Sequence, residues 1–262
     1  MTGSLAVFKL INPDKDKLMK KVHNSIPQQN FADFDLSDSL GQSRSKIIFR
    51  DYDVEHDIAY YSAIHYSETI KSPIRFFLDD IEGIFSDPNV DIRNLPRGTH
   101  TVNSYQAIDT FDVAIDFKSE EIFVFINKRI ANNFMKRFKK SGLLNYEKIY
   151  FNMEKIDNIP DLSNIWGVWE NSTGRCKKKA YFGTEVHKHE EVDKKEVTSY
   201  NVNLEYDDGV VVNFSIMIDC RISSTSKRIT NDGLLDAYHL VKEHLGISNV
   251  NNSVIEVFEE EM

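Results

Sequence analysis

The sequence has little cysteine and no long apolar run. Cys176 and Cys220 are the only two cysteines among 262 residues, and no C-x-x-C spacing occurs. Two thiols are too few for a disulfide framework and are typical of a reducing compartment. The sequence contains no stretch of about 18 apolar residues, the length needed to span a membrane. The start, MTGSLAVFKLINPDKDK, lacks the basic and apolar regions of a signal peptide. We therefore expect a cytoplasmic protein.

Proline and glycine are scarce as well, with 6 and 11 residues, whereas phenylalanine and tyrosine number 17 and 11. Aromatic residues favour strands, so this composition indicates an aromatic-rich sheet core with few breaks. Acidic residues exceed basic ones, 41 to 32, which gives a formal net charge of -9. Because net charge sets the non-specific attraction to polyanions, a nucleic acid would bind only to a local part of this surface.

The common catalytic signatures are missing too. The sequence contains no G-x-S-x-G, P-loop, G-x-G-x-x-G or protein-kinase set. Nucleotide-dependent and acyl-transfer chemistries therefore have no support. No catalytic residue, resident metal or cofactor is predicted on this basis.

Alternation of apolar and other residues predicts strands along much of the chain. One hairpin is expected from Phe111–Phe117 and Ile122–Ile126, joined by a turn at Lys118–Glu120. A second hairpin is expected from Tyr200–Tyr206 and one long strand at Val212–Ile222. Further strands are predicted at Leu5–Ile11, Lys46–Arg50, Ile58–Tyr66, Ile74–Leu78 and Lys148–Met153.

Spacing of three and four residues predicts helices. Ile130, Phe134 and Phe138 recur every four residues within Lys128–Lys140, and Gly142 follows as a helix-terminating residue. A last helix begins at a Thr230 or Asn231 cap, ends at Gly246, and has one apolar face formed by Leu234, Tyr238, Val241 and Leu245. A shorter helix is expected around Leu18.

These elements predict an α+β protein with a mixed or mainly antiparallel sheet and helices packed on one side. The segment from Asp79 to Thr99 carries two Pro and two Gly and indicates a boundary. We expect a smaller N-terminal α+β unit at 1–98, a sheet-and-helix core domain at 99–246 and an acidic C-terminal tail at 247–262.

The outer face of the helix at Lys128–Lys140 is basic, with six Lys or Arg and no Asp or Glu in the stretch. Cations spaced along a helix can lie along phosphates, and each contact releases condensed counterions. Phosphate contacts are predicted at Arg129, Lys136, Arg137 and Lys140. The alternative is a solvated helix face whose cations meet acids elsewhere in the protein.

A second basic cluster consists of Arg175, Lys177, Lys178 and Lys179. The two clusters could converge on one groove, which would strengthen phosphate binding. Neither cluster has the interleaved aromatic residues that stack on single-stranded bases. Duplex DNA, bound through its backbone with little base readout, is therefore the predicted partner.

A metal-dependent nuclease or other hydrolase is the rival hypothesis. Asp112 and Asp116 share a strand face, and His187 and His189 lie two apart on a predicted strand near Glu185. Such groups could supply part of a metal site, which needs three or four convergent ligands. The alternative is that both sets are ordinary charged residues on exposed strands.

A protein-interaction module is the third hypothesis. It would use exposed aromatic residues, among them Trp166 and Trp169, which lie in a stretch too irregular to assign.

The order of elements from Asp112 onward resembles phage-exclusion proteins of the RexA type and, more loosely, the KwaB subunit of the Kiwa anti-phage system. The similar stretches cover about half of the chain and read TFDVAIDFKSEEIFVFINKRIANNFMKRF, KKKAYFGTEVHKHE, NVNLEYDDGVVVNF and KRITNDGLLDAYHLVKEHL. The resemblance implies a cytoplasmic, dimeric, non-enzymatic sensor that binds DNA without strong sequence preference. It also implies a membrane-protein partner with which the sensor stops phage propagation. The basic helix would then contact the DNA.

Overall fold

The computed structural model describes residues 3–13, 15, 44–66, 74–77, 99–102, 108–140, 142, 144–159, 162–171, 178–205, 211–226 and 229–248. The helix expected around Leu18, most of the segment expected to form a boundary, and the tail from residue 249 onward lie outside these residues.

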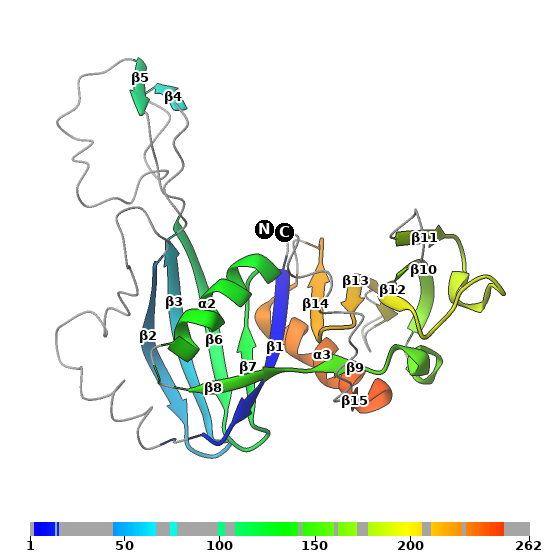
Figure 1. The fold of residues 1–262 in the computed structure, drawn as a ribbon, viewed down its shortest axis with the longest axis horizontal. Coiled ribbons are helices and arrows are strands. Elements are labelled where there is room, and N and C mark those ends of the chain that lie inside the picture. Colours follow the sequence, from blue (N-terminus) through cyan, green and yellow to red (C-terminus); the bar gives the residue numbers. More distant parts are fainter. Residues whose placement is uncertain are drawn as a thin grey trace.

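One 11-stranded sheet organises the described residues (Figure 1). In spatial order its strands are β11 (Lys178–Phe182), β10 (Leu162–Asn171), β12 (Val197–Glu205), β13 (Val211–Met217), β14 (Arg221–Ser224), β1 (Gly3–Ile11), β7 (Glu121–Val124), β6 (Ile108–Asp116), β3 (Ile58–Tyr66) and β2 (Arg44–Asp53), with β8 (Asn145–Lys148) paired to β1. Two small sheets pair β4 (Ile74–Phe77) with β5 (Thr99–Val102), and β9 (Tyr150–Phe151) with β15 (Ile247–Ser248). All described pairs are antiparallel, so the predicted α+β class with a mainly antiparallel sheet is confirmed.

Strand β1 lies in the middle of the large sheet. It pairs with β14 from Gly3 to Ala6, and with β7 along its other edge. Strands β2 and β3 extend the same sheet beyond β6. These three strands of the expected N-terminal unit are thus part of the core sheet, and the predicted boundary near residue 98 does not separate them. The division failed because strands that are distant in sequence can pair with one another.

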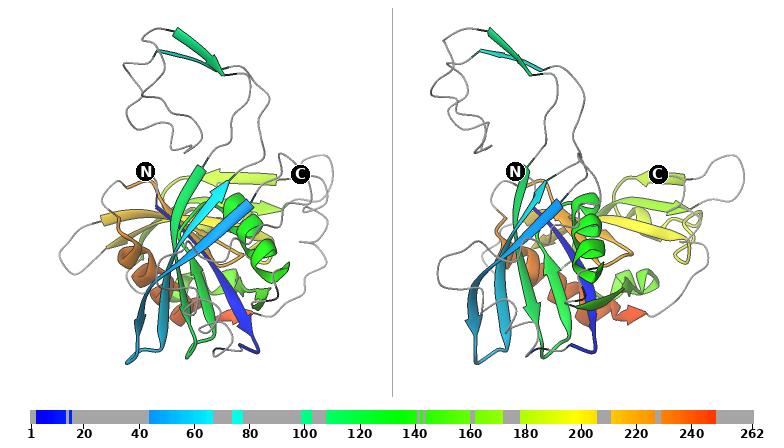
Figure 2. Two further views of the ribbon diagram at one scale, coloured as in Figure 1. Left: turned by 90° about the vertical axis from the view of Figure 1, so that its left-hand side faces the viewer. Right: turned by 60° about the vertical axis from the view of Figure 1, so that its left-hand side comes forward.

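Of the described residues, helices α2 (Lys128–Lys140) and α3 (Asn231–Leu245) cover opposite faces of the sheet (Figure 2). Phe134 of α2 meets Phe111 edge-on, with ring centroids 5.4 Å apart, and Tyr238 of α3 meets Phe123 at 5.6 Å. The pairing of Ala114 with Phe123 places the Phe111 and Phe123 rings on opposite faces. The prediction of helices on one side is therefore wrong. Helix periodicity identifies an apolar face but does not specify which side of a sheet receives it.

The predicted boundaries of α3 are confirmed. The Gly233 amide donates to the Thr230 hydroxyl at 3.2 Å, which caps the first turn. Gly246 follows the last turn with a φ of 70°, a left-handed backbone that suits glycine. Two short 3-10 helices, η3 (Met153–Asn158) and η4 (Val186–Lys188), complete the described elements.

The stretch predicted as one strand at Val212–Ile222 forms two. Strand β13 ends at Met217, the chain reverses, and β14 begins at Arg221. Cys220, fully buried in the turn, has a left-handed φ of 52°. The alternation continued through the reversal because Ile218 and Cys220 in the turn also pack into the core, so the pattern gave no sign of it.

Strand β10 was not predicted, because irregular pairing interrupts its alternation. Its register with β12 shifts three times, once between Ile165 and Gly167, where Trp166 forms the extra residue. A bulge moves later residues to the other face of the sheet. The tryptophan-rich stretch therefore looked irregular in sequence although it forms a ten-residue strand.

A buried carboxylate joins α3 to strand β7. Glu121 is 2% exposed, and its Oε1 accepts hydrogen bonds from the Tyr238 hydroxyl and from Nζ of Lys242, each at 2.7 Å. Burial, and next the Glu121 carboxylate, raise the pKa of Tyr238, so its hydroxyl stays protonated and donates. Within the described part of the chain no group donates to Oε2 of Glu121. Lys242 therefore supplies the compensating charge for this carboxylate.

Removing that charge should weaken the fold. We expect Lys242→Ala to lower the free energy of unfolding by about 2–3 kcal/mol, because a buried carboxylate would lose its counter-charge. Urea denaturation measures the change. Glu243→Ala, an exposed neighbour on α3, serves as the control and should change stability by less than about 0.5 kcal/mol. Adding Glu121→Gln to Lys242→Ala should restore part of the loss; a double variant no more stable than Lys242→Ala would contradict the electrostatic explanation.

Candidate nucleic-acid interface

Helix α2 forms where its sequence predicts. The side chain of Asn127 accepts a hydrogen bond from the Ile130 amide at 3.2 Å, which satisfies one amide of the first turn. The buried side chains of α2 are Ile130, Ala131, Phe134, Met135 and Phe138. Gly142, with a φ of 69°, donates its amide to the Lys139 carbonyl and ends the helix. The opposite face is consequently turned toward solvent.

Three cations occupy that outer face: Arg129, Lys136 and Lys140, here called the basic ridge. All three are exposed. At about 100° per residue they lie within about 40° of one another around the helix axis, and they extend over about 16 Å of its length. Among the residues that the structure describes, none of the three forms an ion pair with a carboxylate. Neutralisation by neighbouring acids, the alternative for this face, does not occur for these cations within the described part of the chain.

The other cations of α2 have partners on the protein itself. Lys128 lies 3.5 Å from an Asp219 carboxylate oxygen, at the turn between β13 and β14. The ammonium of Lys139 lies over the Tyr146 ring, 5.6 Å from its centroid. These cations flank the ridge and fasten the helix to the sheet.

Arg137, a predicted phosphate contact, is half-buried and turned toward the sheet. Its Nη1 lies 3.1 Å from Oγ of Ser45 on β2 and 3.2 Å from Nδ1 of His65 on β3, and Oγ and Nδ1 are 3.0 Å apart. Because a guanidinium only donates, Nδ1 must be the unprotonated acceptor of the imidazole. Arg137 thus joins α2 to two strands, and it differs in position from the ridge cations.

The same contacts keep His65 neutral. Burial, and next the positive charges of Arg137 and Arg129, lower the pKa of His65 to about 4. The imidazole is 3% exposed and offers Arg137 a neutral acceptor rather than an acid. It therefore leaves the positive charge of this helix face undiminished.

The position of Arg129 is unfavourable for the helix itself. Lys128 and Arg129 lie in the first turn of α2, which contains no acidic residue. Backbone dipoles make that end of a helix positive, so a cation there costs about 0.3–1 kcal/mol. Lys136 and Lys140, four residues apart, add a small like-charge repulsion. Lys140, in contrast, lies in the last turn, where a cation is favourable. Helix stability therefore accounts for Lys140 but not for Arg129.

The described lysines of the second basic cluster lie far from the first cluster. Lys178 and Lys179 lie on β11, at one end of the sheet, while α2 packs over the part of the sheet that runs from β1 to β2 (Figure 1). Six strand-to-strand steps separate β11 from β7, or about 30 Å along the sheet. Nζ of Lys179 also lies 3.7 Å from an oxygen of Glu170. Arg175 and Lys177 lie outside the described residues. The expected shared groove is not formed by the described cations.

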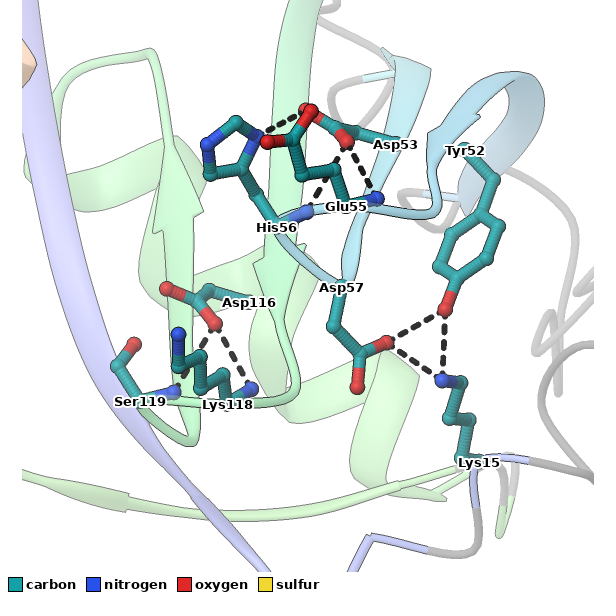
Figure 3. A network of polar contacts seen from close by, with 9 residues as sticks. All are labelled: Lys15, Tyr52, Asp53, Glu55, His56, Asp57, Asp116, Lys118 and Ser119. Atoms are coloured by element: carbon teal, nitrogen blue, oxygen red, sulfur yellow. Dashed lines mark hydrogen bonds and ion pairs between the residues drawn. The ribbon is translucent and has the colours of Figure 1, made fainter.

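The aspartates of the nuclease hypothesis have structural partners. Asp112 accepts a hydrogen bond from the Asn231 side chain at 2.8 Å. Asp116 accepts from the backbone amides of Lys118 and Ser119, at 2.8 and 2.9 Å, and so holds the turn between β6 and β7 (Figure 3). These contacts explain both carboxylates without a metal ion.

The histidines of the same hypothesis do not lie on one strand face. The segment forms η4, with His187 buried and His189 exposed. Nε2 of His187 lies 3.1 Å from Asp157, and burial is the main reason that the pKa of His187 is lowered. Across the described ranges, no group of three His, Cys, Asp or Glu side chains is arranged to hold a metal ion.

A polar network lies at the turn between β2 and β3 (Figure 3). Lys15, beyond the end of β1, donates to the Tyr52 hydroxyl at 2.6 Å and to Asp57. Tyr52 in turn donates to Asp57 at 2.6 Å. The hydrogen bond to Asp57 is the main cause of the raised pKa of Lys15. This network fixes the turn between β2 and β3 to the residues that follow β1.

Comparisons with known proteins do not identify the chain. No protein-family model matches it, and no curated protein matches it. No helix in the described ranges has both the length and the apolar character needed to cross a membrane. The class defined here is an α+β protein with one large antiparallel sheet and a basic helix on one of its faces.

The sequence alone did not indicate the Arg137–Ser45–His65 contact. The three residues come from α2, β2 and β3, and 92 positions separate Arg137 from Ser45. One weak signal existed, since His65 falls on the same strand face as the apolar Ala59, Tyr61 and Ala63. A histidine on a buried face needs a hydrogen-bond partner.

The depressed pKa of His65 predicts acid sensitivity. Its ordinary pKa is 6.5, and its folded-state value is about 4. As pH falls through this interval the unfolded chain binds a proton that the folded chain does not, so stability declines and the contribution reaches about 3 kcal/mol at pH 4. His65→Gln keeps an acceptor for Arg137 and should remove this contribution. Denaturation of both proteins at several pH values between 4 and 7 measures it.

The exposed His56 provides the matched control, and His56→Gln should retain the acid-dependent loss. Parallel stability curves for the unaltered protein and His65→Gln would show that His65 titrates normally, contrary to the structure.

Proposed function

We propose that this protein binds duplex DNA through its phosphate backbone, using the outer face of α2. The observation that carries the proposal is the basic ridge: Arg129, Lys136 and Lys140 are aligned, exposed and unpaired with described carboxylates, on a protein of net charge -9. Phosphates are a suitable ligand because they are regularly spaced anions, and three contacts add affinity without reading sequence.

The ridge itself consists of cations alone; Asn133 lies beside it, about 40° from Arg129 around the helix, and is partly exposed. Phosphate contacts carry no sequence information, so the proposed complex has weak sequence preference. Arg137 contributes indirectly, because it fixes the angle of α2 on the sheet through Ser45 and His65. The second cluster, Arg175, Lys177, Lys178 and Lys179, would contact a different part of a nucleic acid from the ridge.

The biological setting is proposed from the resemblance to RexA-type and KwaB proteins alone. It consists of a non-enzymatic role in phage defence by abortive infection, in the cytoplasm, as a homodimer, with a membrane-protein partner. The charge of α2 is compatible with the DNA-binding part of that role. It bears on none of the other parts.

Charge reversal on the ridge tests the proposal. We expect Arg129→Glu/Lys136→Glu/Lys140→Glu to lower affinity for a random duplex at least tenfold at low salt, because three phosphate contacts are replaced by repulsions. In the unaltered protein the logarithm of the binding constant should fall with the logarithm of salt concentration, with a slope that includes about 0.9 per phosphate contact. The variant should lose about three contacts from that slope. Fluorescence anisotropy at several salt concentrations measures both quantities.

A triple variant elsewhere separates the ridge from overall charge. The control variant is Lys118→Glu/Lys155→Glu/Lys195→Glu. It reverses three exposed lysines and so changes the net charge by the same amount as the ridge variant. It should bind nearly as well as the unaltered protein. Equal losses of duplex affinity in the two variants would show that overall net charge, and not the ridge, determines binding. Unchanged affinity in the ridge variant would exclude α2 as the contact.

A further inference from the structure

An exposed aromatic cluster lies at the β11 end of the sheet, far from α2. Phe182 is 64% exposed, an unusual value for so large an apolar side chain. Its ring stacks against Trp166, with centroids 6.4 Å apart and planes 27° apart, and meets Trp169 edge-on at 5.3 Å. Both tryptophans are partly exposed. The three rings, here called the aromatic cluster, thus present several hydrophobic surfaces to solvent.

The backbone of β10 is shaped to hold this cluster. A Cβ at Gly167 would lie 3.0 Å from the Trp169 ring and 3.2 Å from Cβ of Asn201, so the absence of a side chain lets the indole lie against the strand. Gly167 pairs with Phe182 and Trp169 with Ala180 across the two strands. These side chains therefore share one face of the sheet.

The sequence that leads into β11 is basic, although Arg175 and Lys177 lie outside the described residues. From Ser172 to Thr184 it contains four cations, Arg175, Lys177, Lys178 and Lys179, and no acidic residue. Lys178 is exposed and lies on the same strand face as Phe182, four residues before it on β11 and two before Ala180, the partner of Trp169. Glu170 belongs to the other face, where it is buried and accepts hydrogen bonds from the Tyr181 hydroxyl and the Asp193 amide. A cation and stacking rings therefore occur on the same face of this end of the sheet.

The strands next to the cluster carry amides and hydroxyls on that face. Asn201 and Ser215 form a hydrogen bond of 2.6 Å, and Asn203 and Asn213 form one of 3.0 Å. The pairing of Gly167 with Asn201 places this polar row beside Trp169. The apolar residues that pack with α2 include none from β10 to β14, so no described helix covers the row.

We propose that the aromatic cluster is a second site, which binds single-stranded nucleic acid by stacking unpaired bases on Phe182, Trp166 and Trp169. A polyanion suits the local positive charge, and the planar rings of its bases suit the aromatic faces. A duplex would not serve, because its bases are already stacked and their faces covered. An apolar protein segment would make no use of the basic residues or of the polar row. This site deepens the proposed nucleic-acid function but does not depend on α2.

Tryptophan fluorescence reports on this site directly, because Trp166 and Trp169 are the only tryptophans in the chain. Titration with an oligothymidylate of about 12 nucleotides, a length suited to such sites, should quench the fluorescence through stacking. The matched ligand is an oligomer of the same length with abasic sugars, which carries the phosphates without the bases. It should produce little quenching. Absence of quenching by oligothymidylate at low salt, or equal quenching by the abasic oligomer, overturns the proposal.

Phe182→Ala should weaken oligothymidylate binding about tenfold, in the range found for loss of one stacking partner. The exposure of Phe182 makes the fold insensitive to this change. Tyr60→Ala on β3, another exposed aromatic residue, is the control and should leave binding unchanged. Unaltered affinity in Phe182→Ala also overturns the proposal.

The two nucleic-acid sites can fail separately. The triple ridge variant on α2 should keep the oligothymidylate quenching, and Phe182→Ala should keep its duplex affinity. Quenching that disappears with the ridge variant would assign the single strand to α2, against the second site. A ridge variant that loses duplex binding but keeps the quenching by oligothymidylate would support the aromatic site.

Discussion

The arrangement of this protein depends on the pairing of β1 in the middle of the large sheet. Its side chains alternate between two cores: Leu5 and Val7 pack with α3, whereas Ala6, Phe8 and Leu10 pack with α2. Pairing with β14 on one edge and β7 on the other connects the half of the sheet that ends at β11 to the half that ends at β2. Helix α3 packs on both halves, because Tyr238 also meets Phe123 of β7. The positions of both candidate sites follow from this one strand.

Some cations of α2 contact side chains of the sheet, and others point to solvent. Lys128 and Lys139 find an aspartate and an aromatic ring, and Arg137 finds a serine and a neutral histidine. The ridge cations are directed away from the sheet and have no such partners among the described residues. The cations of the first turn act against helix stability, whereas Lys140 in the last turn favours it. Arg129 is therefore the ridge cation that helix stability explains least.

The two ends of the sheet offer different chemistry. Near α2 the exposed groups are cations on a rigid helix, which suit phosphates held at regular spacing. Near β11 they are aromatic rings beside amides and lysines, which suit flexible, unpaired bases. The distance along the sheet, about 30 Å, makes these two surfaces rather than one. Converging basic clusters were a reasonable expectation from charge alone, yet the topology separates them.

Much of the local structure could be predicted from the sequence. The helix at 128–140, the cap at Thr230 and the hairpin of β6 and β7 were predictable because their signals, periodicity and capping, involve residues within a few positions of each other. The reversal at Cys220 and the strand β10 were not, because buried turn residues and bulges break the link between period and face. The tertiary structure alone decided that Arg137 turns inward while Arg129, Lys136 and Lys140 remain outside. The partners of Arg137 come from strands distant in sequence. No local pattern encodes which side chains those strands bring to a helix.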